Sequence, residues 1–335
     1  MHAVTVAISD PDTGARFIVS GRDAEEPVAA DARFRVGSIT KTFVATVVMQ
    51  LADEHRLRLD DPLLRYVPAS PWGDVSLRQL LRHTGGVPDH TLAAGFADAL
   101  LDKPERRWTT AEVLDLVADR DRDFAPGTAY AYSNTGYVLL GQVIQAVTGQ
   151  PWARVVRQRI IEPLGLGDTS IAGVDDPATD TISGWFDTSG DGFDDPVTGP
   201  WPALDTTEGP AGALVSTAPD LVRFARALFE GDLVSRDARR EMTTPGQFHP
   251  PHSNYGAGRR TAPTRLPHRR AGPQRITARL SRHHVVPTRP ASRDRRPGQR
   301  LPREHGRPRA AAPGPMRWCT SERHPYLSHA MRNTG

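Results

Sequence analysis

Ser38 and Lys41 stand three residues apart at the start of a run, residues 42–51, that is apolar almost all round. A helix without a polar face is buried, so its first turn is expected at the floor of a cleft. Residues three apart share one face of a helix, which places the lysine amine beside the serine hydroxyl. Burial lowers the pKa of a lysine, and a neutral amine can activate a serine as a nucleophile. The pair therefore predicts nucleophilic catalysis by Ser38.

Lysine usage favours this chemistry over the structural alternative, in which Ser38 is a helix N-cap and Lys41 a surface cation. The chain has only two lysines, Lys41 and Lys103, against forty arginines. A lysine can lose its proton near neutral pH when it is buried, whereas an arginine cannot. The position therefore favours a cation that releases its proton.

The elements that must position this pair begin with a hairpin. Apolar runs at 3–8 and 16–20 flank a Pro/Asp/Gly turn, which predicts two antiparallel strands. Residues 171–208 show little periodicity and are predicted to be mostly loop. Apolar periodicity and capping residues predict helices over residues 76–82, 110–120, 138–147, 152–161 and 217–229. A hairpin needs further strands to be stable, so the C-terminal part is expected to supply them.

Charge divides the chain into two parts. Residues 1–258 carry 23 basic against 36 acidic residues, a balance of −13, whereas residues 259–335 carry 19 arginines against 3 acids, a balance of +16. In the second part prolines recur every few residues and no helical or strand period survives, so we predict a disordered Arg/Pro-rich tail. Its charge leaves open a different function, the binding of nucleic acid or another anionic surface. Because no nucleic-acid-binding motif accompanies the charge, nucleic acid is not an expected partner.

Composition excludes several further classes. The single cysteine, Cys319, excludes an intramolecular disulfide and a cysteine-rich metal site. No run of about 18 apolar residues is present, so no membrane-spanning helix is expected. Residues 1–10 lack the basic start, apolar core and cleavage site of a signal peptide, which predicts a cytoplasmic location.

Five segments together resemble the serine β-lactamase and penicillin-binding protein family, within it the branch of class C β-lactamases, D-alanyl-D-alanine carboxypeptidases and esterases. They are FRVGSITKTF (34–43), LDDP (59–62), LLRHTGG (80–86), YSNTGY (132–137) and GALVSTAPD (212–220). The resemblance covers about residues 3–258, which we take as one hydrolase domain. It implies an α+β fold, in which an antiparallel sheet flanked by helices adjoins an all-helical lobe and Ser38 lies between them.

The resemblance also implies a role for four residues. Ser38 would be the acylated nucleophile, and Lys41 would help to deprotonate it. Tyr132 would act as base or proton shuttle, because a tyrosine of ordinary pKa, about 10, works at neutral pH only beside positive charge. The structural alternative for Tyr132 is a core aromatic. Asn134 would hydrogen-bond the substrate amide and fix Lys41.

The implied function is a serine hydrolase that acts through an acyl-enzyme on a small-molecule or peptide-like amide or ester. A β-lactam, a D-Ala-D-Ala peptide and a small ester all remain open as substrates. No cofactor and no metal are implied. The alternatives are a catalytically inactive protein of the same fold and a binder of anions through the basic tail.

The chain departs from the family in its third motif, His/Lys-Thr/Ser-Gly, whose strand lines the cleft and supplies one of two oxyanion N–H donors. His83-Thr84-Gly85 has the same letters but lies between the first and second motifs, where we expect a structural loop and assign no catalysis. No such triplet follows Asn134. The C-terminal strands are therefore expected to be absent and the activity impaired, since losing one oxyanion donor typically costs about 100- to 1000-fold in rate.

We hypothesise that the reading frame slips near residues 256–258, so that residues 259–335 are an out-of-frame product. The family carries Tyr-Gly-x-Gly where this chain has YGAG (255–258), and the resemblance ends there. Sequencing the genomic locus across the codons for residues 255–270 tests the hypothesis. We expect one gained or lost base, whose correction opens a frame containing His-x-Gly. The same uninterrupted frame in independent templates would reject it.

Overall fold

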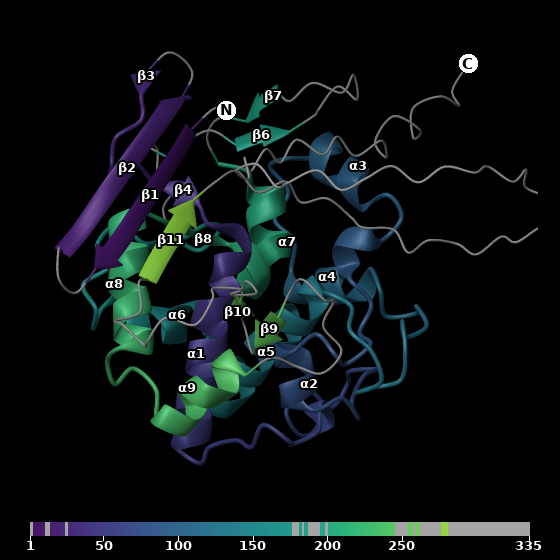
Figure 1. The fold of residues 1–335 in the computed structure, drawn as a ribbon. Coiled ribbons are helices and arrows are strands. Elements are labelled where there is room, and N and C mark those ends of the chain that lie inside the picture. The colour runs from purple at the N-terminus through teal and green to yellow at the C-terminus, as the bar shows by residue number, and fades with distance from the viewer. Residues whose placement is uncertain are drawn as a thin grey trace, which may run out of the picture.

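The computed structural model describes residues 3–10, 14–23, 26–175, 181–182, 184–186, 195–197, 200–244, 254–256, 259–261 and 276–280. A sheet lies on one side of the molecule and a body of helices on the other (Figure 1). The predicted α+β class is confirmed by this arrangement of antiparallel strands and helices. Within the described ranges, none of the helices combines the length and apolar character needed to cross a bilayer.

The predicted N-terminal hairpin is confirmed. Strands β1 (Ala3–Asp10) and β2 (Gly14–Asp23) pair antiparallel along their whole length, while the turn at residues 11–13 lies outside the described residues. Side chains of β1 alternate as a strand requires, with Thr5, Ala7 and Ser9 buried. Helix α8 (Ala218–Phe229) packs against this strand, so the hairpin is one layer and α8 belongs to the next (Figure 1).

The prediction that no strand follows residue 258 is wrong for two short segments. Strand β10 (Arg259–Thr261) pairs with β9 (Asn254–Gly256), and β11 (Ile276–Leu280) adds to the sheet antiparallel to β1, in the order β11-β1-β2-β3. An edge strand offers unpaired N–H and C=O groups to any extended segment, whatever its side chains. The sequence ITARL also alternates apolar and polar residues, a period too short to stand out among arginines and prolines.

A second small sheet holds the start of the Ser38 segment. Its antiparallel strands are β4 (Phe34–Arg35), β8 (Leu214–Ser216) and β5 (Ser170–Ile171), with β8 in the centre. Past β4, the N–H of Val36 donates to the carbonyl of Leu214 at 2.9 Å, which extends this attachment toward Ser38. The remaining short strands are β3 (Glu26–Pro27), paired with β2, and β6 (Gly184–Phe186), paired with β7 (Asp195–Val197).

The helices cover most of the predicted ranges, although several are shorter than expected. They are α1 (Thr40–Asp53), α2 (Leu77–Leu81), α3 (Phe96–Asp102), α4 (Thr110–Asp115), α5 (Asn134–Thr148), α6 (Trp152–Val156), α7 (Pro202–Gly212), α8 and α9 (Arg236–Thr243). Residues 157–161 continue α6 as a π-helical turn. The predicted cap Ser76 forms a full capping box with Gln79, and α5 ends at Gly149 in the left-handed conformation with φ 71°.

The prediction of mostly loop over 171–208 is wrong for its last residues, because α7 begins at Pro202. Its sequence, rich in Gly, Pro and Thr, has a low intrinsic helix propensity. Packing against α1 and α5 supplies the stability that propensity does not (Figure 1). The helix is also interrupted, since Gly209 has φ 37° and ψ −121° and Pro210 follows it.

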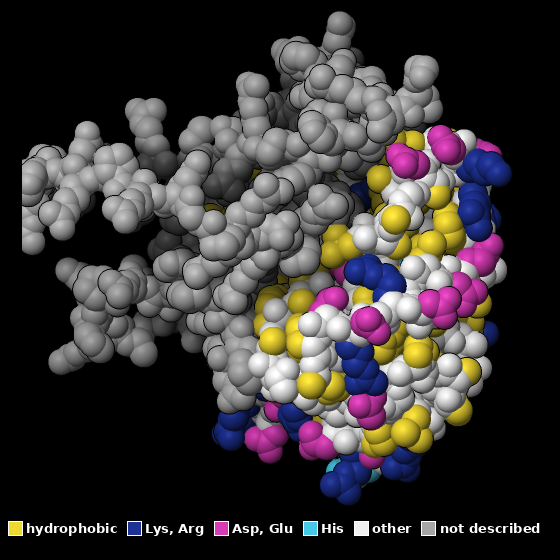
Figure 2. Space-filling view, turned by 90° about the vertical axis from the view of Figure 1, so that its right-hand side faces the viewer, with side chains coloured by type: hydrophobic (Ala, Val, Ile, Leu, Met, Phe, Trp, Pro, Cys, Tyr) yellow, Lys and Arg dark blue, Asp and Glu magenta, His cyan; other side chains and the backbone are white. Residues whose placement is uncertain are grey.

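Helices α1 and α5 form the centre of the core. Ten of the 14 residues of α1 are buried, which confirms the prediction of a helix without a solvent face. Phe43 of α1 stacks on Phe224 of α8, with ring centroids 3.8 Å apart. On the face that Figure 2 shows in colour, acidic and basic side chains are interspersed with apolar ones. That face therefore offers no extended basic patch of the kind that binds nucleic acid.

The loop 83–86, which contains the misplaced His-Thr-Gly triplet, has a structural requirement for glycine. Gly86 has φ +68°, and a Cβ on it would lie 2.0 Å from the carbonyl oxygen of Phe124. We expect Gly86→Ala to lower the free energy of unfolding by more than about 3 kcal/mol, since it combines left-handed strain with a backbone clash.

Gly95→Ala is the matched control, because Gly95 has φ +74° with nothing within 4 Å of the added Cβ. It should cost only about 1 kcal/mol, the strain alone. Denaturant unfolding of both variants measures the difference. Equal losses would show that the contact with Phe124 does not matter.

Candidate active site

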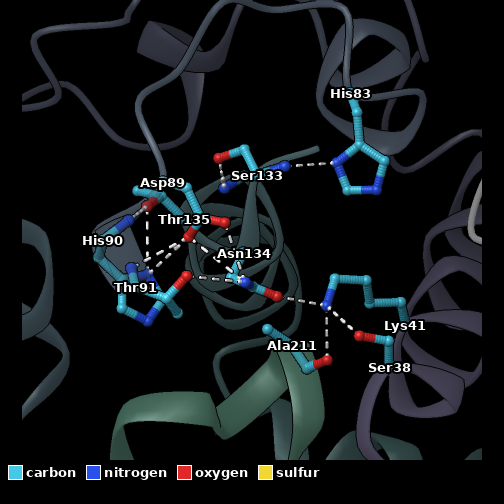
Figure 3. A network of polar contacts seen from close by, with 11 residues as sticks. Ser38, Lys41, His83, Asp89, His90, Thr91, Ser133, Asn134, Thr135 and Ala211 are labelled. Carbon is cyan, nitrogen blue, oxygen red and sulfur yellow. Dashed lines mark hydrogen bonds and ion pairs between the residues drawn. The ribbon is translucent and has the colours of Figure 1, made fainter. Parts of the chain in front are cut away.

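Ser38 lies in a 3₁₀ turn (Gly37–Ile39) directly before α1, and Lys41 lies in the first turn of α1. Ser38 is exposed, whereas Lys41 is fully buried beneath it, with 0% of its surface exposed. The Lys41 Nζ donates to the Ser38 Oγ at 3.1 Å, as the spacing of three predicts (Figure 3). The N–H of Leu214 donates to the Thr40 Oγ1 at 3.0 Å, which ties this turn to β8.

The Lys41 ammonium has an acceptor for each of its three N–H groups. Besides Ser38, the Nζ donates to the Asn134 Oδ1 at 2.7 Å and to the Ala211 carbonyl at 2.7 Å (Figure 3). Burial lowers the pKa of Lys41 to about 8, against the opposing effect of the Glu208 and Asp89 carboxylates. The lysine can therefore exchange a proton near neutral pH, because the loss of water destabilises its charged form. The three protein acceptors replace only part of that hydration.

Tyr132 contacts the same serine oxygen. Its Oη donates to the Ser38 Oγ at 2.6 Å, and the Lys41 Nζ lies 4.8 Å from the centroid of its ring. The tyrosine is half-buried in the segment that leads into α5, so the alternative of a core aromatic does not describe it. Two groups able to carry a proton thus meet at one hydroxyl.

Asn134 is the first residue of α5 and is placed by the cap of that helix. The Ser133 Oγ accepts from the N–H of Gly136 at 3.2 Å, and the N–H of Ser133 donates to the His83 Nδ1 at 3.1 Å. The cap leaves the Asn134 side chain buried, with its oxygen toward Lys41. The structure thus brings together all four residues that the sequence singles out.

His83 lies behind this cluster. Its ring packs on that of Tyr132 with centroids 4.3 Å apart, and its carbonyl accepts from the N–H of Ala131 at 3.1 Å. Together with the bond from Ser133, these contacts hold the segment that carries Tyr132. They fit the structural role predicted for the loop 83–86.

Sequence reasoning missed three contributors to the site, namely Asp89, Glu208 and the carbonyl of Ala211. Asp89 accepts from the side-chain nitrogen of Asn134 at 3.0 Å. Glu208 is buried, and burial raises its pKa although the charge of Lys41 opposes this. Only Asp89 had a usable signal, because an Asp before a turn is a common cap.

The third motif has no counterpart among the described residues. The strands after residue 244 read NYG, RRT and ITARL, and none contains His or Lys followed by Thr/Ser-Gly. Among the described residues, no three His, Cys, Asp or Glu side chains are grouped so as to hold a metal ion.

Comparison with known proteins places this site in a family. A family model described as Beta-lactamase matches residues 2–275. Penicillin-binding protein 4 of Amycolatopsis lactamdurans is 34% identical over 224 residues, which are 64% of this chain and 55% of that protein. Esterase EstB of Burkholderia gladioli is 31% identical over 167 residues, 45% of this chain and 41% of that protein. The chain spans about half the length of the curated relatives it matches.

Solved structures agree in fold. A D-stereospecific amidohydrolase from Streptomyces sp. superposes with a TM-score of 0.68 at 34% identity, covering 76% of this chain and 77% of that one. D-amino acid amidase from Ochrobactrum anthropi SV3, complexed with D-phenylalanine, gives a TM-score of 0.68 at 29% identity, with 78% and 76% covered. With the family model matched over residues 2–275, the chain belongs to the β-lactamase family.

Proposed function

We propose that this protein is a serine hydrolase that forms an acyl-enzyme on Ser38. The observation that carries the proposal is the position of the Ser38 Oγ, 2.6 Å from the Tyr132 Oη and 3.1 Å from the Lys41 Nζ. A nucleophile within hydrogen-bond reach of a base, itself oriented by a further group, is the arrangement required for covalent catalysis. Asn134 is that further group, because its oxygen holds the Lys41 Nζ at 2.7 Å.

The proposed reaction has two halves. In the first, the Ser38 Oγ attacks the substrate carbonyl carbon while its proton passes to Tyr132 or Lys41 in the deprotonated state. The tetrahedral intermediate expels an amine or alcohol, which takes that proton and leaves an ester on Ser38. In the second, water attacks this ester, gives a proton to the same group, and the acid is released as the proton returns to Ser38. The backbone N–H of Ser38 is proposed as one oxyanion donor.

The proposed substrates are amides or esters of small or peptide-like acyl groups. The names of the relatives support this class, since they include a D-stereospecific amidohydrolase, a D-amino acid amidase, an esterase and a D-alanyl-D-alanine carboxypeptidase/endopeptidase. The two amide-hydrolysing neighbours favour an acyl group derived from a D-amino acid. Because the third motif has no counterpart among the described residues, we propose a reduced rate, by about 100- to 1000-fold if one oxyanion donor is lost.

Covalent labelling tests the nucleophile. We expect a fluorophosphonate probe to modify the full chain at one residue, Ser38, and the signal to disappear in Ser38→Ala. Among the serines that the structure describes, Ser38 alone has both Tyr132 and Lys41 beside its oxygen. Peptide mapping by mass spectrometry locates the adduct.

Ser235→Ala is the matched control, because Ser235 is the N-cap of α9 and bonds to Asp53 at the other end of α1. It should lose about 1 kcal/mol of stability and keep full labelling. Labelling that survives Ser38→Ala, or a folded wild-type chain that is never labelled, would contradict the proposed function.

The pH dependence of labelling tests the base. Since the pKa of Lys41 is lowered to about 8, the neutral amine becomes available as the pH rises through this value. We expect the labelling rate to rise about tenfold per pH unit below pH 8 and to level off above it. In Lys41→Arg the positive charge persists at every pH, so the rate should fall by about 100-fold or more and lose this inflection. An unchanged profile in Lys41→Arg would remove the lysine from the proton path.

A further inference from the structure

The side-chain amide of Asn134 is held between a group that only donates and a group that only accepts. Its Oδ1 accepts from the Lys41 Nζ at 2.7 Å, and its Nδ2 donates to the two Asp89 oxygens at 3.0 and 3.3 Å (Figure 3). An ammonium has no acceptor and a carboxylate has no donor, so the reversed amide would face both partners with the wrong group. Asp89 therefore determines which end of Asn134 reaches the lysine.

Oxygen acceptors gather around the side-chain nitrogen of Asn134. The Thr91 Oγ1 lies 3.5 Å from the same nitrogen, so three oxygens lie within 3.5 Å of it. Asn134 is 7% exposed and Asp89 is 6% exposed, so the bond between them is buried and losing either partner would be costly.

Asp89 itself is rigidly placed. Its Oδ1 accepts from the N–H of Thr91 at 3.1 Å as the cap of a short 3₁₀ turn, residues 90–92. The next residue is fixed to α5, because the N–H of His90 donates to the Thr135 Oγ1 at 2.8 Å. Burial lowers the pKa of His90 to about 4, so its neutral ring does not neutralise the carboxylate 3.9 Å away. In the described part of the chain, no arginine or lysine forms an ion pair with Asp89, and the nearest compensation is Lys41 across the amide.

We propose that Asp89 is a positioning residue that fixes Asn134 as a bridge to Lys41. Asp89 thereby keeps the amine aimed at the Ser38 Oγ and supplies the negative charge that compensates it. The catalytic part of this inference rests on the proposed function. The hydrogen bonds among Asp89, Asn134 and Lys41 are observed independently of it.

The arrangement of Asp89, Asn134 and Lys41 has a measurable effect on the pKa of Lys41. The titratable groups that face the amine are Asp89, Glu208, His90, Tyr132 and Tyr137. Desolvation lowers the pKa of Lys41, while Asp89 and Glu208 raise it. When the charge of Asp89 is removed, only Glu208 still opposes the lowering of the Lys41 pKa by desolvation. In Asp89→Asn the lysine should therefore lose its proton at lower pH.

Lysine NMR measures this directly, because the full chain contains only two lysines. We would incorporate [ε-¹³C]lysine, identify the Lys103 signal with Lys103→Arg, and follow the Lys41 signal with pH. In Asp89→Asn we expect the midpoint to fall by about one pH unit, the scale of removing one nearby charge.

The matched control is Asp220→Asn, which alters another buried aspartate, 3% exposed, that accepts from Thr169 rather than from the site. Its Lys41 midpoint should stay at the wild-type value. An unchanged midpoint in Asp89→Asn, or equal shifts in both variants, would overturn the proposal. Neither readout uses activity, so a failure of labelling at Ser38 would refute the proposed function separately.

A second measurement avoids the risk that Asp89→Asn does not fold. The chain has three asparagines, Asn134, Asn254 and Asn333, so [¹⁵N]asparagine labelling gives three side-chain NH₂ groups. Asn254→Gln and Asn333→Gln identify the Asn134 pair. We expect both of its protons to exchange with solvent at least about tenfold more slowly than those of an exposed amide, since the side chain is buried and its nitrogen donates to Asp89. Exchange of either proton at the rate of an exposed amide would overturn the proposal.

Discussion

The constraint on which this structure depends is the burial of one charged amine beside a serine. Removing an ammonium from water is costly unless protein acceptors replace the water. The three acceptors of Lys41 come from distant parts of the chain: Ser38 before α1, Asn134 at the start of α5 and Ala211 at the end of α7. The fold must therefore bring three helix ends to one point, and the packing of α1, α5 and α7 against one another does so (Figures 1 and 3).

The irregular end of α7 follows from the same constraint. A carbonyl in the last turn of a helix has no partner within that helix, so Ala211 is free to accept from Lys41. The helix reaches this position only because it packs closely on α5, where a Cβ on Gly141 would lie 2.5 Å from the Pro210 side chain. Gly212 is close to the Glu208 side chain as well, because a Cβ on it would meet the carboxylate and make that side chain shift. The run GPAG (209–212) has no evident period in the sequence. Its conformation follows from its contacts with Gly141, Glu208 and Lys41.

These requirements explain how far the sequence predicts the site. Ser38 and Lys41 are recognisable because one helical turn brings them together, and Tyr132 and Asn134 because they lie in one short segment. Nothing local marks Ala211 or Glu208, whose roles arise from the shape of a kinked helix that periodicity does not predict. Strand β11 escapes prediction for a related reason, since it pairs through backbone atoms that every residue possesses. The domain boundary at residue 258 and the origin of the tail remain proposals from composition.

Two buried acids, Glu208 and Asp89, lie near the buried Lys41, so the charge of the lysine depends on both of them. Burial favours the protonated form of Glu208. Asp89 accepts hydrogen bonds from Asn134 and Thr91. The charge of Lys41 opposes this protonation of Glu208, and the negative charge of the two acids in turn favours the charged form of Lys41. When Lys41 gives up its proton the cluster becomes negative, and that charge favours the proton's return. The acids thus keep the pKa of Lys41 from falling as far as burial alone would take it, at about 8. At that value the lysine can both accept a proton from Ser38 and pass one on to a leaving group.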